Sequence, residues 1–152
     1  MLIKVEFGSS PFNLVQAREY VSEIVGKPVE NDDTEITVPN GVFDNLDQVK
    51  RELLGFVDVR LVKWNKNPHS QIETPSNITS AVISADLLDD SGNEMRIENL
   101  ETPIQIKIPS KLAKTGESEC RFLDTKVNRW TRIGVQTVKD GEYTICTTNH
   151  LT

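Results

Sequence analysis

The chain has 152 residues, the length of one ordinary domain and enough to bury about two thirds of the surface that the unfolded chain exposes. Its 17 Lys and Arg residues against 23 Asp and Glu give a formal net charge of -6, which favours neither a nucleic-acid partner nor direct contact with an anionic membrane. No apolar run approaches the roughly 18 residues of a membrane-spanning helix, and no cysteine-histidine cluster has the spacing of a metal site.

Residues 1–29 predict a strand followed by a helix. Residues 1–7 alternate in the manner of a strand and lack the basic-then-apolar pattern of a signal peptide. Ser10 can cap a helix that Pro11 opens, and Gly26 followed by Pro28 would close it. Between these limits apolar residues recur at helical spacing, at positions 14, 17, 21 and 24.

Residues 30–118 predict the body of a sandwich. A second, shorter helix is predicted over residues 44–54, before Gly55. The rest consists of short runs rich in β-branched residues and separated by turn residues, and such runs continue to the C-terminus. The predicted strands cover residues 35–38, 57–64, 80–87, 104–108, 129–133, 135–138 and 142–146. This spacing indicates a mainly β protein, an antiparallel β-sandwich with one or two short helices near its N-terminus.

Two acidic loops, two cysteines and one glycosylation sequon are candidate sites that the residues themselves offer. The loops at residues 30–35 and 86–94 hold oxygen ligands of the kind that calcium prefers, but neither matches a complete calcium loop, so we expect solvated turns and neither a metal nor a cofactor. Cys120 and Cys146 are compatible with a disulfide, with two buried thiols or with a reactive pair. Asn77 begins a glycosylation sequon, which would be used in a secreted protein.

The C-terminal third carries a motif of several elements at fixed spacing. In chain order these are Cys120, Phe122, Trp130, Gly134, Cys146 and the tripeptide His150-Leu151-Thr152. The order resembles the GPCR proteolysis site, or GPS motif, that closes a GAIN domain in adhesion receptors and polycystin-like membrane proteins. A fainter match at residues 62–68 and 78–84 resembles the polycystin and egg-jelly-receptor branch. The resemblance makes residues 1–152 one GAIN-like domain, with the GPS motif at 119–152.

The resemblance also implies a disulfide between Cys120 and Cys146. The family often carries four cysteines in two disulfides, and the positions that match the second pair are Val135 and Thr148, so both partners of one bridge are missing together. The remaining bridge would close the loop 120–146, a constraint worth about 3 to 4 kcal/mol in the chain-entropy model. A structural disulfide places the domain outside the cell or in a lumen.

The reaction that the resemblance implies is cleavage of the chain's own backbone between Leu151 and Thr152. The hydroxyl of Thr152 would attack the Leu151 carbonyl with His150 as general base, which moves the acyl group from nitrogen to oxygen, and water would hydrolyse the ester. The reaction happens once per molecule, unlike that of a turnover enzyme. Because a relaxed amide resists conversion to an ester, we expect the scissile bond in a tight, disulfide-braced bend. No acidic residue adjoins His150 in sequence, so the group that orients the imidazole must come from the fold.

The residues and this resemblance leave three candidate functions. The first is an extracellular autoproteolytic regulatory module of a membrane receptor or polycystin-like channel protein, at the outer face of the plasma or ciliary membrane. It implies that the natural protein continues beyond Thr152 into a strand held non-covalently in the sandwich, and then into a membrane-embedded portion. The alternative is a non-cleaving structural or adhesion module that binds a protein or glycan partner. A calcium-dependent adhesion module is a third possibility.

Overall fold

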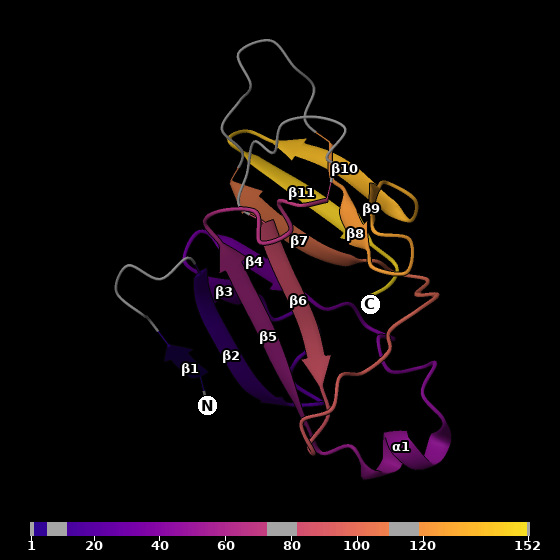
Figure 1. The fold of residues 1–152 in the computed structure, drawn as a ribbon. Helices are drawn as coiled ribbons and strands as arrows, with labels where there is room; N and C mark the ends of the chain where they lie inside the picture. Colours follow the sequence, from indigo (N-terminus) through magenta and orange to yellow (C-terminus); the bar gives the residue numbers. More distant parts are fainter. Residues whose placement is uncertain (1, 6–11, 73–81, 110–118, 152) are drawn as a thin grey trace.

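The computed structural model describes residues 2–5, 12–72, 82–109 and 119–151 (Figure 1). Its regular structure is almost entirely antiparallel strand, in two larger sheets and one two-stranded sheet, which confirms the predicted mainly β fold. No helix in these segments is long and apolar enough to cross a membrane. Asn77, Thr152 and the predicted helix cap at Ser10 and Pro11 lie outside the described residues.

The first sheet has the strand order β1-β2-β5-β6. Its members are β1 (Leu2–Val5), β2 (Phe12–Tyr20), β5 (Phe56–Trp64) and β6 (Val82–Leu88), each antiparallel to its neighbour. β2 and β5 pair along their whole lengths, from Phe12 opposite Trp64 to Tyr20 opposite Phe56. Alternate β5 residues, Val57, Val59 and Leu61, are fully buried because side chains two apart on a strand share one face.

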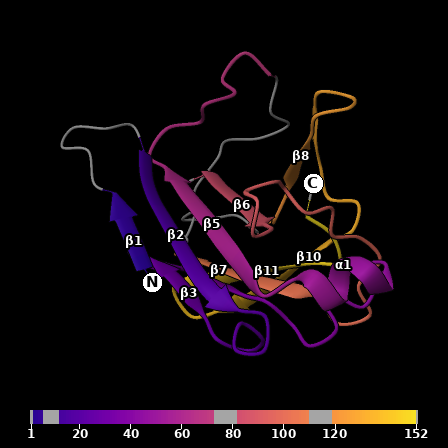
Figure 2. The same cartoon turned by 90° about the horizontal axis from the view of Figure 1, so that it is seen from below.

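The second sheet has the order β10-β11-β7-β4-β3. Its members are β3 (Val29–Asn31), β4 (Thr34–Thr37), β7 (Ile104–Pro109), β10 (Val135–Asp140) and β11 (Tyr143–Thr148). A two-stranded sheet of β8 (Phe122–Asp124) and β9 (Arg129–Thr131) lies beside it. Figure 2 shows β2 and β5 of the first sheet lying across the strands of the second, as in a sandwich.

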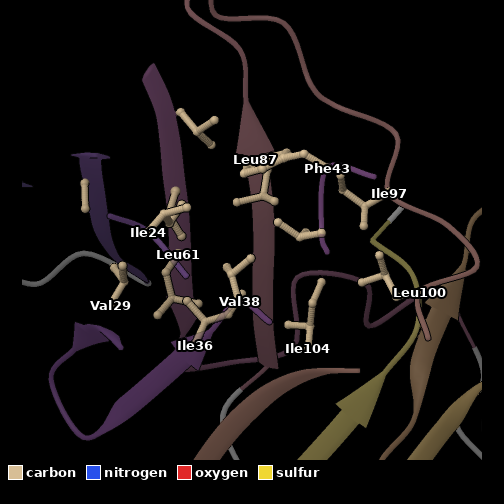
Figure 3. Close-up of a cluster of buried hydrophobic side chains, with 14 of the residues drawn as sticks. Ile24, Val29, Ile36, Val38, Phe43, Leu61, Leu87, Ile97, Leu100 and Ile104 are labelled. Carbon is tan, nitrogen blue, oxygen red and sulfur yellow. The ribbon is translucent and has the colours of Figure 1, made fainter. Parts of the chain in front are cut away.

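The core fills the space between the two sheets (Figure 3). Ile36 and Ile104 of the second sheet and Leu61 and Leu87 of the first are 0–1% exposed. Burying one such side chain stabilises the fold by about 1.5 to 3 kcal/mol. The segment between β6 and β7 adds Ile97 and Leu100 at the end of this cluster that lies nearest the C-terminus, where the candidate site is built.

The predicted N-terminal helix is wrong, because residues 12–20 form strand β2. Its burial alternates with period two: Val15 and Ala17 are buried, while Arg18 and Tyr20 lie toward solvent. Apolar residues spaced by three or four do occur here, but pairing with β1 on one side and β5 on the other satisfies the backbone on both edges. Tertiary pairing of this kind overrides a local helical pattern.

The second predicted helix exists in a shorter form, α1 (Gln48–Leu53). Asp47 is its N-cap, and its carboxylate accepts a hydrogen bond from the Lys50 amide at 2.9 Å. The apolar stripe of this helix does not reach the core, since Val49 is 65% and Leu53 74% exposed. The helix is therefore held by its cap and by its flanking residues rather than by a buried face.

The two acidic loops form tight turns. Residues 31–34 join β3 to β4 through Asp32, which has a φ of 61°, and Asp32 and Asp33 both pair with the Lys63 ammonium. In the second loop the Asp89 carboxylate accepts from the amides of Ser91 and Asn93, which confirms the predicted turn. Among the described residues, no group of three or more His, Cys, Asp or Glu side chains is arranged to hold a metal ion.

Candidate functional site

A disulfide fixes the segment that leads into β8 to strand β11 of the second sheet. Cys120 and Cys146 form a disulfide with Cα atoms 5.7 Å apart, which confirms the predicted bridge. Cys146 lies in the middle of β11, opposite Thr137 of β10 on one side and Ile106 of β7 on the other. The Cys120 amide donates to the Thr137 hydroxyl at 2.8 Å. The segment that leads into β8 is thus attached to the β10–β11 hairpin at two points.

The backbone bends directly after β11, and the bend is held by the segment between β6 and β7. The Asn149 carbonyl accepts from the Leu100 amide at 3.1 Å, and the Leu151 amide donates to the Ile97 carbonyl at 2.9 Å. Ile97 and Leu151 form an isolated antiparallel bridge, and Leu151 packs against the core. His150 therefore lies between two residues whose backbones are each hydrogen-bonded to buried structure.

The His150 side chain is half-buried and lies against apolar groups. The Phe122 ring and the imidazole pack in a T-shaped arrangement, with ring centroids 4.7 Å apart and an interplanar angle of 71°. Gly134, which has a φ of 79°, also approaches the imidazole closely. A Cβ added at Gly134 would be 3.1 Å from His150 Nε2 and 3.3 Å from His150 Cδ2. In the part of the chain that the structure describes, no acidic side chain hydrogen-bonds the His150 ring. The ring is oriented by shape, from β8 and from the turn before β10.

The two positions that match the family's second cysteine pair face each other. Val135, at the start of β10, is the Cα partner of Thr148, at the end of β11. This register is the one in which a cross-strand bridge could form, so the mapping from sequence agrees with the geometry. The Thr148 hydroxyl instead donates to the His150 carbonyl at 3.0 Å and is within 3.3 Å of the His150 amide.

An open groove of about 520 Å³ lies beside the bend. Leu100, Glu101 and Pro103 line one part of it, and Gly134, Gln136, Thr148 and Asn149 are among the residues that line the rest. The groove reaches Gly134, which contacts the imidazole, and Thr148 and Asn149, which precede His150, so solvent can approach the bend from this side.

Of the sequence-predicted site residues, the structure joins Cys120 to Cys146 and places His150 and Leu151 in the bend after β11, while Thr152 and the sequon Asn77 lie outside the described residues. Sequence reasoning assigned no role to three neighbours of His150, which are Phe122, Gly134 and Thr148. Phe122 and Gly134 belong to the recognised motif, so a signal for them existed. Thr148 could be suspected only as the place of a missing cysteine.

Three features define the class of this domain. They are the antiparallel sandwich, the Cys120–Cys146 disulfide near its C-terminal end, and the bend that holds His150 and Leu151. Residues 5–152 match the family model described as GPS: GAIN subdomain B. The chain therefore belongs to the GAIN subdomain B family.

A search of solved structures finds the same fold in the full extracellular region of zebrafish Gpr126/Adgrg6. The TM-score is 0.69 at 15% sequence identity, over 99% of this chain and 23% of that chain. At this identity the likeness shows the fold alone, and the chain spans less than a quarter of that structure. No curated protein matches the sequence.

Proposed function

We propose that this domain is an extracellular regulatory module of a membrane protein and that it cuts its own backbone between Leu151 and Thr152. The observation that carries the proposal is the placement of His150. Its imidazole contacts the Phe122 ring and Gly134, while the backbone on either side of it is hydrogen-bonded to the segment between β6 and β7. A general base needs such a fixed position relative to its proton donor.

In the proposed reaction, the imidazole of His150 takes the proton from the Thr152 hydroxyl as its oxygen attacks the Leu151 carbonyl carbon. The carbon-nitrogen bond then breaks, and the proton passes from the imidazole to the leaving Thr152 amine. The product is an ester between the Leu151 acyl group and the Thr152 oxygen. Water, which can enter along the groove beside Thr148 and Asn149, hydrolyses this ester to a Leu151 carboxylate and a free Thr152 hydroxyl.

No charged group assists His150 in the proposed mechanism, so the conformation of the bend must favour the reaction instead. A hydroxyl is a weak nucleophile, and acyl transfer to it is favourable only from an amide that is already held away from its relaxed geometry. Leu151 is held from two sides, since its amide donates to Ile97 and its side chain packs on the core. Such anchoring allows the fold to impose a conformation on the peptide bond that follows Leu151.

The wider context of the module is also a proposal. The family and the disulfide support an oxidising, extracellular location, at the plasma or ciliary membrane, where Asn77 would be glycosylated. We expect the natural protein to continue from Thr152 into a strand that stays bound in the sandwich after cleavage, and then into the membrane. The matches at residues 62–68 and 78–84 favour a parent protein of the polycystin and egg-jelly-receptor branch over an adhesion receptor.

Denaturing electrophoresis of the full-length protein tests the proposal. The wild type should give two fragments, and Thr152→Ala and His150→Ala should each give one band of the intact length. Native size-exclusion chromatography should show the two wild-type fragments eluting together, because strand pairing outlasts the cut. A wild-type protein that remains a single band under denaturing conditions overturns the self-cleavage.

The missing second bridge favours one other function, a structural or adhesion module that keeps the fold without cutting. Val135 and Thr148 leave the β10–β11 hairpin with one covalent brace where the family often has two. A single wild-type band would support this alternative, in which partner binding maps to surfaces away from His150.

A further inference from the structure

Thr148 occupies an unusual place for a hydroxyl. It is the last residue of β11, it is 8% exposed, and it faces Val135 at the position where the related domains often place a cysteine. A buried hydroxyl without hydrogen-bond partners is destabilising. The hydrogen bonds that the Thr148 hydroxyl makes therefore explain how a threonine can be buried at this position.

Both hydrogen bonds of the Thr148 side chain go to the backbone of His150. The hydroxyl donates to the His150 carbonyl at 3.0 Å and accepts from the His150 amide at 3.3 Å. Contacts of a threonine with the residue two positions ahead close a small turn and set the local backbone dihedrals. Among the described residues, no other group hydrogen-bonds to the His150 amide or carbonyl. The hydroxyl of Thr148 thus holds the peptide groups on both sides of the His150 Cα.

We propose that Thr148 is a positioning residue for the self-cleavage, an inference that rests on the proposed function. It sets the backbone dihedrals of His150, and these determine how the imidazole lies against Phe122 and Gly134 and how the Leu151 peptide enters the bend. Related domains often carry a disulfide at this position, which ties β11 to β10. In this chain a hydrogen-bonded turn acts on the reacting segment directly.

The proposal distinguishes the hydroxyl from the bulk of the side chain. Thr148→Val keeps the shape and the strand preference but removes both hydrogen bonds, whereas Thr148→Ser keeps the hydroxyl. Thr147→Val is the matched control, because it makes the same change one residue earlier, on a side chain with no hydrogen bond to His150 among the described residues.

The first measurement is the rate at which newly made full-length protein is cleaved, followed by pulse-chase labelling and denaturing electrophoresis. Thr148→Val should slow cleavage by about tenfold, whereas Thr148→Ser and Thr147→Val should stay within about twofold of the wild type. The melting temperature of each variant is recorded, so that loss of fold is separated from loss of positioning. A wild type that cleaves and a folded Thr148→Val variant that cleaves equally fast overturn the inference and leave the proposed function standing.

The second measurement does not depend on cleavage. In the Thr152→Ala protein, amide hydrogen exchange at His150 and Leu151 should become about tenfold faster when Thr148→Val is added, and exchange at Ile145 should not change. If the wild type does not cleave, the proposed function fails. The exchange rates then test separately whether Thr148 fixes the backbone of His150. Equal exchange with and without the Thr148 hydroxyl overturns it.

Discussion

The surroundings of His150 show how one residue without a side chain can shape a site. Gly134 has a φ of 79°, and the space that a Cβ would take there lies 3.1 Å from the imidazole Nε2. Gly141, in the turn between β10 and β11, has a similar φ of 62°, but a Cβ added there would meet no atom of a non-adjacent residue within 4 Å. The two glycines therefore share a backbone requirement and differ only in what a methyl group would touch.

This pair yields a matched prediction for the site. Gly134→Ala should move the imidazole by a few tenths of an ångström and reduce the cleaved fraction of the full-length protein severalfold, while Gly141→Ala should leave cleavage unchanged. Both should lose about 1 kcal/mol of folding free energy from the left-handed backbone. Electrophoresis gives the cleaved fraction and denaturant titration the stability. Equal cleavage in the two variants would show that contact with Gly134 does not place the ring.

In the first sheet, the neighbours of Asp58 set the pKa of its carboxyl group. Asp58 is 4% exposed, and its carboxylate accepts hydrogen bonds from Arg18 Nε at 2.7 Å and from the side-chain Nε2 of Gln16 at 2.9 Å. The hydrogen bond from Arg18 lowers the pKa of Asp58 below its usual value, against the effect of burial, and the bond from Gln16 lowers the pKa further. The folded state therefore favours the ionised carboxylate.

A carboxylate with a lowered pKa in the folded state makes stability depend on acid pH. Above the unfolded pKa of about 3.9 its contribution is complete, and it is lost as pH falls through the lower folded pKa. Unfolding free energies of the wild type should therefore decrease below about pH 4, and Asp58→Asn should decrease less steeply over the same range. Urea titrations at a series of pH values measure both slopes. Parallel pH profiles for the two proteins would show that Asp58 does not cause the loss of stability in acid.

Among the elements, β2 shows most clearly what local sequence cannot decide. Its apolar residues fit a helical period as well as a strand, and the deciding factor is pairing with β1 and β5, which lie at either side of it in the sheet. Strands β3 and β8 have three residues each and carry too short a pattern to be found. The longer strands β5, β6, β7 and β11 were predictable because β-branched residues and turn residues mark them over their whole lengths.

Helix α1 gives the converse case, an element that was predicted, over a longer range, and whose own apolar residues do not hold it in place. Its stripe of apolar residues is solvent-exposed, so Leu53→Ser should change the unfolding free energy by less than about 0.5 kcal/mol. Leu61→Ala, in the buried face of β5, should cost about 2 to 5 kcal/mol. Thermal and denaturant unfolding of the two variants test this difference. A large loss from Leu53→Ser would mean that the helix buries this residue in solution.

On the scale of the whole molecule, the candidate site is assembled from segments that are far apart in the chain. The disulfide joins Cys120 to β11, Gly134 precedes β10, and Ile97 anchors Leu151 from the segment after β6. The motif indicated the cysteines, the histidine and the glycine as a set. The anchoring by Ile97 and Leu100 could not be predicted, because backbone hydrogen bonds between irregular segments leave no residue pattern.

The two sheets explain why such a site can persist. Their shared core ends at Ile97 and Leu100, which are both buried, so the bend that carries His150 is attached to one end of the core. A bond held at an unfavourable geometry persists only where the surrounding structure over-determines it. We therefore expect the peptide bond that follows Leu151 to be the one that is cut, as proposed above.

Intact-mass spectrometry of the denatured full-length protein tests that claim most directly. We predict two polypeptides, one ending at Leu151 and the other beginning at Thr152, whose masses sum to that of the uncut chain plus one water. A single mass equal to that of the uncut chain, or a cut at any other bond, would contradict it.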